Sequence, residues 1–517
     1  MSNATLIGID LGTTFSAVAV FDDTGRSTIV TNTDGDNITP SVVSFTGTQS
    51  VLVGEEARKL LDLDDHTLGR FKRDMGEKEV TYQAGGKNHN PTSLSAFVLK
   101  KLKDDSVPPI APDDQVVITV PASFEHHARA ATKAAAQNAG LKVKQLINEP
   151  TAAAIYFAVN KTTPPRGNYV VFDLGGGTFD VTVLHLSGDK IRTGANADSP
   201  EKAVNVLASE GASHLGGDDF DKALQKIVQA RYYDETGETL EPIDFTTNEA
   251  EETKKTLSKK DQALVSKRSS RGRTVITVTR NEFEEAISDK IVHMRKLCEC
   301  AIKTSGIDIA DIEGVILAGG STRIPRIQEL ARTVFNQEPI LHSNVDEIVA
   351  LGAAVFAAYT SRDQLNPVQK GEVDKLEVQE VSKLFLGTLA QEDNRPHTEL
   401  IERNSILIMK GDKLPAAKTR AYYTLHDGQT SVGCEVTECA IEETNPQYVN
   451  IIWKGALALP PGRPKGQRID VTYKYRADQT LYCEFLDVAT GTRTVADTTI
   501  GSPATQQSDI IEEFTVE

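Results

Sequence analysis

Hydrophobic and polar positions follow two different patterns along this chain, and the change between them divides it. Up to about residue 360, short apolar runs such as 115–120 alternate with longer amphipathic stretches such as 281–304. The short runs predict buried strands, and the amphipathic stretches predict helices. Because the two kinds alternate, the pattern predicts an α/β fold in which helices cover the sheets.

The pattern changes near residue 381. From there to about residue 499, short alternating runs such as 468–475 are separated by glycine, asparagine and proline, which is typical of an all-β domain. The stretch before it is polar, charged and contains proline, as linkers do. We therefore expect an α/β domain over 1–360, a linker over 361–380, a β-sandwich over 381–499 and a disordered acidic tail over 500–517.

Two segments of the α/β region, 7–14 and 170–180, repeat one sequence pattern. Each is an apolar run that ends in Asp, followed by glycine with threonine and then by a second strand-like run. Glycines let backbone N–H groups approach an anion, threonine hydroxyls add donors, and the Asp can hold a hydrated cation. Two copies predict two similar lobes that grip one phosphate chain from opposite sides.

Composition narrows the class of protein. At 517 residues the chain is too long for one core, and two to four domains are expected. Its net charge of −17, from 56 basic and 73 acidic residues, argues against nucleic-acid binding as the main function. Five cysteines without a Cys-x-x-Cys pair, no export signal and no apolar run of membrane-spanning length predict a cytoplasmic protein that is not membrane-bound.

Five motifs together resemble the heat-shock-protein-seventy (DnaK-like) molecular chaperones. They fall in that family's order over residues 4–358, at 9–14, 147–154, 172–180, 214–221 and 319–325. The resemblance implies an actin-like, two-lobed ATPase domain with ribonuclease H-like repeats, followed by an all-β sandwich. It also implies ATP or ADP with Mg²⁺ as ligands, K⁺ as a further candidate ion, and a role in the stress response as a slow ATPase coupled to protein folding.

The resemblance assigns roles at the phosphate end of the site. Asp10 and Asp173 would hold Mg²⁺ through its waters, since magnesium keeps several waters and takes few carboxylates. Lys72 would contact the γ-phosphate and the attacking water, and Glu149 would orient or deprotonate that water, so that catalysis is mostly positioning and charge neutralisation. The residues expected to cradle the phosphates are Gly12, Thr13, Thr14, Gly175, Gly176, Gly177 and the catalytic Thr178.

The nucleoside end is similar to the family pattern but altered. The matching residues are Glu251, Lys254, Lys255, Ser258, Gly319, Gly320, Ser321, Arg323 and Asp346. Gly216, Gly217 and Asp218 are expected to bind the nucleotide as well, without assignment to one end. Family members commonly have arginine where Lys255 stands, and its plane stacks on the base. A lysine cannot stack in that way, so weaker base affinity is expected. Without the resemblance, residues 251–255 would be interpreted as a solvated helix face.

Departures gather where two domains must communicate. Pro121 and Arg129 match residues that the family uses to relay nucleotide state. Gln145, however, stands where many members carry an arginine that meets the activating J-domain. In the linker, Glu377 and Gln379 replace apolar docking residues, and burying them would cost free energy unless they are paired. Coupling between ATP and substrate is therefore expected to be weak or rewired.

The β domain resembles the family's substrate-binding sandwich only weakly. The implied peptide-groove positions are Thr388, Gln391, Tyr422, Leu425, Val432, Cys434 and Ile469. An ordinary sandwich core explains several of them equally well. A peptide could bind there as an extended strand through backbone hydrogen bonds. After residue 499 too little chain remains for the helical lid of typical members, so bound peptide is expected to leave faster.

Three functions remain open from the sequence. The first is a lidless, DnaK-like ATPase that binds unfolded or extended polypeptide, with a J-domain co-chaperone and a nucleotide exchange factor as candidate partners. The second is a nucleotide-binding scaffold that docks one fixed protein partner with little ATP cycling. The third, a sugar kinase or filament protein on the same fold, ranks last because it has no reason for a β-rich carboxyl domain. Intact Asp10, Lys72, Glu149 and Asp173 favour hydrolysis, whereas Gln145, the altered linker and the missing lid favour the scaffold.

Overall fold

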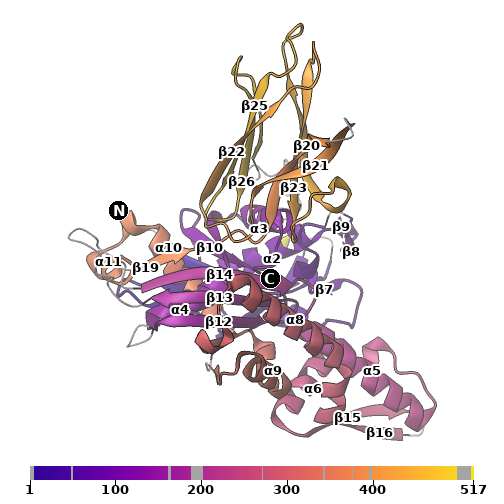
Figure 1. Cartoon of the computed structure of the whole chain (residues 1–517). Coiled ribbons are helices and arrows are strands. Elements are labelled where there is room, and N and C mark those ends of the chain that lie inside the picture. The colour runs from indigo at the N-terminus through magenta and orange to yellow at the C-terminus, as the bar shows by residue number, and fades with distance from the viewer. Residues whose placement is uncertain are drawn as a thin grey trace. The chain divides into compact units, whose positions relative to one another are not determined.

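The chain forms two compact units, shown in Figure 1. The computed structural model describes residues 5–47, 50–77, 79–160, 165–187, 202–270, 272–341, 344–374, 376–394, 399–497 and 514–516. The first unit comprises residues 1–378 together with 504–517, and the second comprises residues 379–503. The division after residue 378 falls inside the segment expected to be the linker, and the chain end belongs to the first unit.

One six-stranded sheet organises the first half of the first unit. Its strands, in spatial order, are β11 (Lys142–Asn148), β10 (Gln115–Val120), β1 (Leu6–Asp10), β2 (Phe15–Phe21) and β3 (Ser27–Val30), and β4 (Thr39–Pro40) pairs with β2. The pairs β1–β10 and β10–β11 are parallel, whereas β1–β2 and β2–β3 are antiparallel. The central strands β1, β2 and β10 are apolar because they are buried on both faces of the sheet.

A second six-stranded sheet repeats this arrangement in the second half of the unit. Its order is β18 (Pro339–Ile340), β17 (Ile312–Ala318), β12 (Gly167–Leu174), β13 (Phe179–Ser187), β14 (Lys202–Ala212) and β19 (Leu376–Gln379). As in the first sheet, the strand that ends in Asp lies between an antiparallel partner and a parallel one. The two Asp-Leu-Gly segments therefore occupy equivalent places, as two similar lobes require.

Two helices join the halves. α4 (Glu149–Asn160) and α10 (Ile348–Thr360) share one apolar core with residues of both sheets, including Val117 and Val171. α10 is apolar all round, as expected of a helix that is covered on every side. A Cβ atom at Gly352 would lie 1.8 Å from the backbone oxygen of Ala152, so only glycine permits this close crossing.

The remaining elements of the first unit form smaller groups around the sheets. In the first half these are α1 (Glu55–Lys59), β5 (Val42–Phe45), β6 (Ser50–Val53), β7 (Thr67–Gly69), η1 (Phe71–Asp74), β8 (Tyr82–Ala84), β9 (Lys87–His89), α2 (Pro91–Asp105) and α3 (His126–Asn138). In the second half they are α5 (Gly217–Thr236), η2 (Pro242–Asp244), α6 (Thr247–Lys259), β15 (Gln262–Ser269), β16 (Gly272–Thr279), α7 (Arg280–Ala286), α8 (Ser288–Ser305), η3 (Ile309–Asp311), η4 (Gly320–Arg323), α9 (Pro325–Phe335), η5 (Arg362–Gln364) and α11 (Pro367–Val373). Figure 1 shows α5, α6 and the β15–β16 hairpin gathered at one end of this unit.

The second unit is built from two antiparallel four-stranded sheets. One has the order β21 (Glu399–Ile408), β20 (Phe385–Asn394), β23 (Ser431–Cys439), β24 (Asn450–Ala458), and the other β22 (Ala416–Tyr423), β25 (Arg468–Tyr475), β26 (Leu481–Asp487), β27 (Arg493–Asp497). A single apolar core takes residues from both sheets, among them Val436 and Tyr473. Besides these strands, the described residues 380–497 contain one 3-10 turn, η6 (Pro446–Tyr448), and no α-helix.

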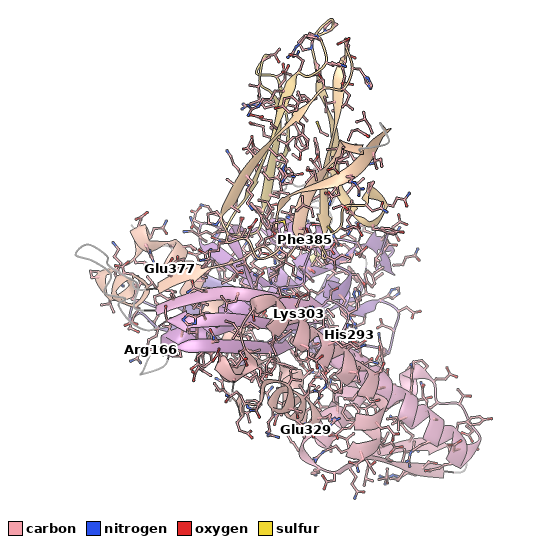
Figure 2. The ribbon with its side chains drawn as sticks, viewed as in Figure 1. Arg166, His293, Lys303, Glu329, Glu377 and Phe385 are labelled. Carbon is pink, nitrogen blue, oxygen red and sulfur yellow. The ribbon has the colours of Figure 1, made fainter. Side chains whose placement is uncertain are left out.

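The segment expected to be a linker ends in an edge strand. β19 extends the second sheet beside β14, with Leu376 buried and Val378 partly buried in the core that α4 and α10 share. Glu377, labelled in Figure 2, is exposed because successive side chains of a strand point to opposite faces. The expected cost of burying this carboxylate is therefore not incurred. Gln379 donates its side-chain amide N–H to the backbone oxygen of Leu414 at 2.5 Å, and this hydrogen bond offsets the cost of its partial burial.

The chain end differs from the expected disordered tail at the residues that the structure describes. Phe514 is buried in the core of the first half, and β28 (Thr515–Val516) pairs with β6. The rest of the predicted tail lies outside the described residues. Within the part of the chain that the structure describes, no helix combines the length and the hydropathy that crossing a membrane requires.

Candidate functional site

The two glycine–threonine turns that the sequence singled out lie against each other. A Cβ atom at Gly176 would fall 1.8 Å from the hydroxyl oxygen of Thr14, and one at Gly177 would fall 2.6 Å from that of Thr13. Such distances are too short for any side chain. The turn after β12 therefore needs glycine in order to face the threonines of the turn after β1.

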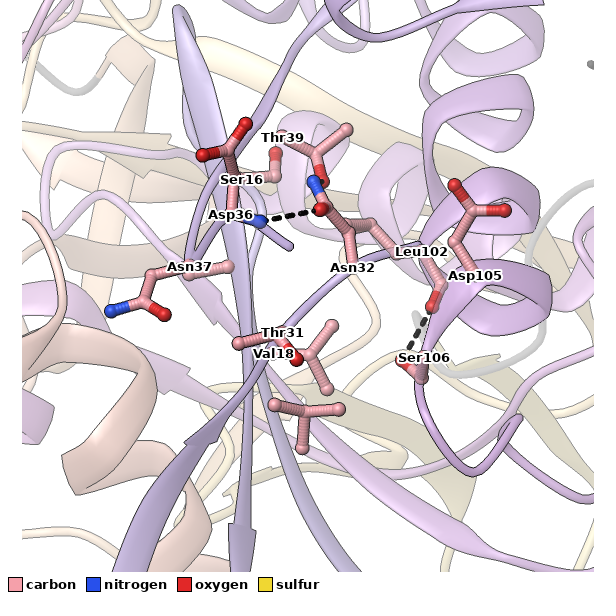
Figure 3. A pocket seen from close by; sticks show the side chains of 12 residues that line it. Ser16, Val18, Thr31, Asn32, Asp36, Asn37, Thr39, Leu102, Asp105 and Ser106 are labelled. Atoms are coloured by element: carbon pink, nitrogen blue, oxygen red, sulfur yellow. Dashed lines mark hydrogen bonds between the residues drawn. The ribbon is translucent and has the colours of Figure 1, made fainter. Parts of the chain in front are cut away.

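Serine hydroxyls brace the turn after β1. The backbone N–H of Gly12 donates to Ser16 Oγ at 3.1 Å, and Ser41 Oγ donates to the backbone oxygen of Gly12 at 2.8 Å. Ser16 and Ser41 also share a hydrogen bond of 2.9 Å between their hydroxyls. Figure 3 shows Ser16 in a small polar pocket of the first half, next to Thr39 and Asn32. The turn predicted to bind phosphate is thus held in place by two serine side chains.

The turn after β12 is held by the start of α5 instead. The N–H groups of Gly217 and Asp218 donate to the backbone oxygens of Gly175 and Gly176 at 3.0 and 2.8 Å. Ser321 Oγ donates to the same Gly175 oxygen at 2.9 Å. Gly216 packs so tightly on this turn that a Cβ atom would lie 2.4 Å from the Gly176 oxygen. The motif 214–221 therefore positions the second turn.

Two buried carboxylates end the central strands. Asp10 Oδ1 accepts a hydrogen bond from Thr119 Oγ1 at 2.6 Å, whereas Asp173 Oδ2 has no hydrogen-bond partner. Burial first, and then the charge of Glu149, raises the pKa of Asp10 from 3.8 to about 7. The same two causes raise the pKa of Asp173 well above its usual range. Two buried carboxylates, one with an unpartnered oxygen, fit a hydrated divalent cation such as Mg²⁺.

A buried ion pair stands beside these carboxylates. Lys72 Nζ donates to Glu149 Oε1 at 2.7 Å, and both residues are almost fully buried, at 3% and 8% exposure. Lys72 comes from η1 and also lies 5.7 Å from the centre of the Phe124 ring, while Glu149 is the first residue of α4. A buried charge pair of this kind persists only where geometry is fixed on both sides. The site thus contains a fixed ammonium and a fixed carboxylate.

Of the two predicted relay residues, Arg129 connects to this pair through the residue before Glu149. Arg129 donates to the backbone oxygen of Phe124 at 3.0 Å and to Asn148 Oδ1 at 2.5 Å. The backbone oxygen of Pro121 accepts from the N–H of Phe124 at 3.2 Å. Arg129 therefore holds the residue that precedes α4, whereas the Pro121 bond closes a local turn at Phe124.

On α6, the predicted nucleoside residues are engaged with protein groups. Lys254 Nζ lies 2.9 Å from Asp221 Oδ2 and donates to the backbone oxygen of Gly217 at 3.1 Å. Burial raises the pKa of Asp221 from 3.8 to about 6, against the opposing charge of Lys254. Ser258 Oγ donates back to the oxygen of Lys254. Lys254 thus joins α6 to the start of α5.

Lys255 is held at one side by carboxylates. Its ammonium lies 2.9 Å from Glu251 Oε1 and 2.9 Å from Glu252 Oε1, and about half of its side chain is exposed. The charge and hydrogen bond of Glu251 hold the pKa of Lys255 above its usual value despite burial. A flexible ammonium tied to two acids offers a point charge and no flat face for a base.

The opposite wall of the nucleoside end comes from η4 and the start of α10. Gly319 has φ of +79°, and a Cβ atom there would lie 2.3 Å from the backbone oxygen of Leu174, so the position needs glycine. At Gly320 a Cβ atom would lie 2.7 Å from Asp346 Oδ1. Arg323 donates to Asp346 Oδ2 at 2.6 Å, which brings together two residues predicted for this pocket.

Arginines of the first half that the sequence analysis did not select link it to the second half. Arg70, with φ of +63°, lies 2.9 Å from Asp218, and Arg73 bonds to both oxygens of Asp219. Arg58 bonds to Glu251 at 3.2 Å. For Arg70 and Arg73 the sequence offered one signal, their place beside Lys72, and for Arg58 it offered none. These ion pairs cross the cleft between the lobes.

The predicted peptide-groove positions divide into buried and accessible residues. Thr388, Cys434 and Ile469 are buried in the second unit, and Cys434 and Ile469 belong to its core. Their burial leaves little surface for a peptide in this conformation, and their groove role stays a prediction. Tyr422 and Val432 are partly buried, whereas Gln391 and Leu425 are exposed, and for these four the groove stays a prediction.

The fold defines a class of protein: a doubled α/β domain in which two glycine–threonine turns face each other, followed by a β-sandwich. A family model described as "Hsp70 protein" matches residues 6–84 and 71–517. The chain is also 34% identical over 551 aligned positions to the stromal 70 kDa heat shock-related protein, chloroplastic, of Pisum sativum, covering 99% of this chain and 72% of the relative. The chain belongs to the Hsp70 family, which confirms the resemblance found in its motifs.

Membership settles the general character of the protein. Hsp70 proteins are chaperones that bind ATP or ADP with Mg²⁺, act as ATPases, and bind unfolded polypeptides and co-chaperones. The family implies an actin-like ATPase domain and a β-sandwich, and the mixed α/β unit and the all-β unit are consistent with both.

Proposed function

We propose that this protein is an ATP-dependent chaperone that hydrolyses ATP slowly in its first unit and holds extended polypeptide in its second unit, whose described residues form no α-helix. One observation carries the proposal: the buried Lys72–Glu149 ion pair stands beside the buried carboxylates Asp10 and Asp173. A protein that only held nucleotide would need the phosphate turns but not a fixed ammonium and carboxylate at the phosphate end.

The cation that accompanies ATP would be held by Asp10 and Asp173. When bound, Mg²⁺ supplies positive charge against the phosphate oxygens and relieves the repulsion between these carboxylates. The unpartnered oxygen of Asp173 and the pKa of Asp10, raised despite the nearby charge of Lys72, support this assignment, because a bound cation would favour the charged form of both carboxylates.

The chain's own groups then divide the work of hydrolysis. Glu149 orients a water and accepts its proton, and Lys72 stabilises the negative charge that develops on the transferred phosphoryl group. Thr13, Thr14 and Thr178 supply hydroxyl donors from the two turns, and the hydroxyl of Thr14 is buried without a partner, so it is free to donate to a phosphate oxygen.

The second unit supplies the substrate side of the proposal. A polypeptide bound there would lie as an extended strand with its backbone hydrogen-bonded to a sheet edge, and Gln391 and Leu425 are the exposed predicted contacts. The described part of this unit contains no α-helix that could cover such a peptide. A J-domain protein and a nucleotide exchange factor are the proposed partners, and a reducing cytoplasm the proposed location, since all five cysteines are free.

ATP turnover with and without an unfolded peptide tests the proposal. The full chain should hydrolyse ATP in a Mg²⁺-dependent way, and a reduced, unfolded peptide should increase the rate. Glu149→Gln is the control for contaminating ATPases, since it removes the proton acceptor and keeps the size of the side chain. Turnover that Glu149→Gln does not reduce would refute hydrolysis at this site. Slow turnover that no peptide alters would favour a scaffold with one fixed partner.

A further inference from the structure

The last described residues of the chain return to the first unit. The chain leaves this unit at residue 378, builds the β-sandwich, and belongs to the first unit again from residue 504. The end of the sequence reads Ile510-Ile511-Glu512-Glu513-Phe514-Thr515-Val516-Glu517. Its single aromatic residue, Phe514, is 4% exposed, although its sequence context is acidic. Burial of an aromatic ring from an acidic tail calls for a specific socket.

The backbone of this segment completes a sheet edge. β5 pairs with β6 on one side only, and β28 takes the other side of β6 in parallel, with Thr515 opposite Ser50 and Val516 opposite Val51. Without β28, the N–H and C=O groups on that side of β6 would be open for another strand. Pairing of an extended chain end with an open edge is a recurring way to bind peptides.

The side chain of Phe514 fills an aromatic socket in the first half. Its ring lies 5.5 Å from Phe45 and 5.8 Å from Phe97, with interplanar angles of 77° and 88°, which are the edge-to-face arrangements that aromatic rings prefer. His89 lies 6.3 Å away, and the ammonium of Lys87 stands 5.3 Å from the ring centre. Aromatic contacts on several sides and a cation over the ring make the socket selective for an aromatic residue.

We propose that the edge of β6 with this socket, formed by Phe45, His89 and Phe97, is a peptide-docking site whose occupant is the chain's own carboxyl-terminal segment, bound in cis. The β-sandwich is then tethered to the ATPase unit at both of its ends, by β19 and by β28. A two-residue strand and one ring form a small anchor, so the segment is exchangeable for the same sequence offered as a separate peptide.

Peptide binding to a shortened chain tests the exchange. The probe is a fluorescein-labelled synthetic peptide of residues 504–517, followed by anisotropy with the full chain and with a chain that ends at Glu513. The peptide should bind the shortened chain saturably and at least tenfold more tightly than the full chain, whose own tail occupies the site. A Phe514→Ala peptide should bind at least tenfold more weakly, and a Thr515→Ser peptide, changed at an exposed side chain, should bind as the parent does.

A second measurement keeps the full-length fold. Carboxypeptidase should release the last residues of the Phe514→Ala chain at least tenfold faster than those of the unchanged chain, because docking protects them. Equal release rates, or equal peptide affinity for the full and shortened chains, would overturn the proposal. A full chain that is a dimer and becomes a monomer on shortening would show that the tail docks on a second copy, and would overturn docking in cis. Neither assay uses ATP, so failure here is independent of the proposed hydrolysis.

Discussion

The two phosphate turns are equivalent in the fold but are supported differently. The turn after β1 is braced by the hydroxyls of Ser16 and Ser41, and its Asp10 has a hydrogen-bond donor in Thr119. The turn after β12 is braced by backbone N–H groups at the start of α5, and its Asp173 keeps one oxygen without a partner. Equivalent strands thus place the two turns, and unlike neighbours give them unlike chemistry.

The same contrast extends to the helices that follow in each half. The start of α4 presents Glu149 to Lys72, whereas the equivalent start of α10 follows Asp346, which binds Arg323. Both groups that would act on the attacking water therefore come from the first half, and the second half would supply the wall of the proposed nucleoside pocket. Duplication explains the geometry of the site, and divergence between the copies explains its proposed division of labour.

The largest effect should distinguish Glu149 from Asp346 by their contributions to kcat. Glu149→Gln removes the proposed proton acceptor and should lower kcat by about 10²- to 10⁴-fold with nucleotide binding retained. Asp346→Asn removes a partly exposed ion pair and should weaken ADP affinity by about fivefold or less with kcat kept. Single-turnover hydrolysis and calorimetric titration with ADP measure the two quantities. Equal losses of kcat in both variants would contradict the division between the halves.

A smaller effect should separate two adjacent glycines of the second turn. Gly176→Ala forces the turn away from Thr14 and should weaken nucleotide affinity about tenfold or more, equivalent to about 1.4 kcal/mol. Gly175→Ala is the matched control, because the nearest atom to its Cβ would be 4.0 Å away. ADP titration of both variants measures the difference. Similar losses at both positions would mean that contact between the turns does not determine affinity.

The two carboxylates should differ in their effect on stability without ligand. Because burial raises the pKa of Asp10 from 3.8 to about 7, the folded state holds more protons than the unfolded state between these pH values. Stability without ligand therefore falls as pH rises from about 4 to 7. Asp10→Asn and Asp173→Asn remove this penalty and should raise Tm at pH 8 by about 2 to 4 °C, or about 1 kcal/mol.

The increase in Tm should become smaller toward pH 4. It should be larger for Asp173→Asn than for Asp10→Asn, because Asp173 keeps an unpartnered oxygen. Thermal unfolding in EDTA across pH 4 to 8 measures it, and the unchanged chain with Mg²⁺ and ADP is the reference for the liganded state. A lower Tm for both variants at pH 8 would mean that the carboxylates are compensated by protein groups alone.

The smallest effect should distinguish the serines that hydrogen-bond to the two turns, Ser16 at the turn after β1 and Ser321 at the turn after β12. Ser16→Ala leaves the N–H of Gly12 without its acceptor and should cost about 1 kcal/mol in the free energy of unfolding. Ser321→Ala removes a donor from the Gly175 oxygen, which still accepts from Gly217, and should cost about half as much. Urea unfolding measures the free energy of unfolding of both variants. A larger loss for Ser321→Ala would mean that the turn after β12 depends more on its serine than the turn after β1 does.

The duplication was predictable from the sequence because its signal is local. An apolar run, an Asp and a glycine turn lie within about ten residues in each copy, and their chemistry follows from residue type. The ion pairs across the cleft were not predictable in this way. Arg73 and Asp219 are 146 residues apart, and a charged residue in a polar segment gives no sign of which opposite charge the fold brings to it.

Strand alternation also has a limit, which the second unit illustrates. It correctly groups Cys434 with Val436 on one strand face, but it cannot say whether that face is covered by the other sheet or open to a peptide. At Phe514 the composition predicted disorder, because the tail is acidic and polar. The structure instead buries the ring of Phe514 among residues that are distant in sequence. Both cases depend on tertiary partners, which a local sequence pattern does not contain.

The pairing of β28 with β6 has a consequence for biosynthesis. A ribosome delivers the chain from its amino end, so the aromatic socket around Phe45 exists long before Phe514 has been added. The first half can be folded except at this one edge while the whole β-sandwich is still being made. The nascent ATPase unit therefore carries an open strand and an unfilled apolar site until Phe514 and the residues of β28 have been made.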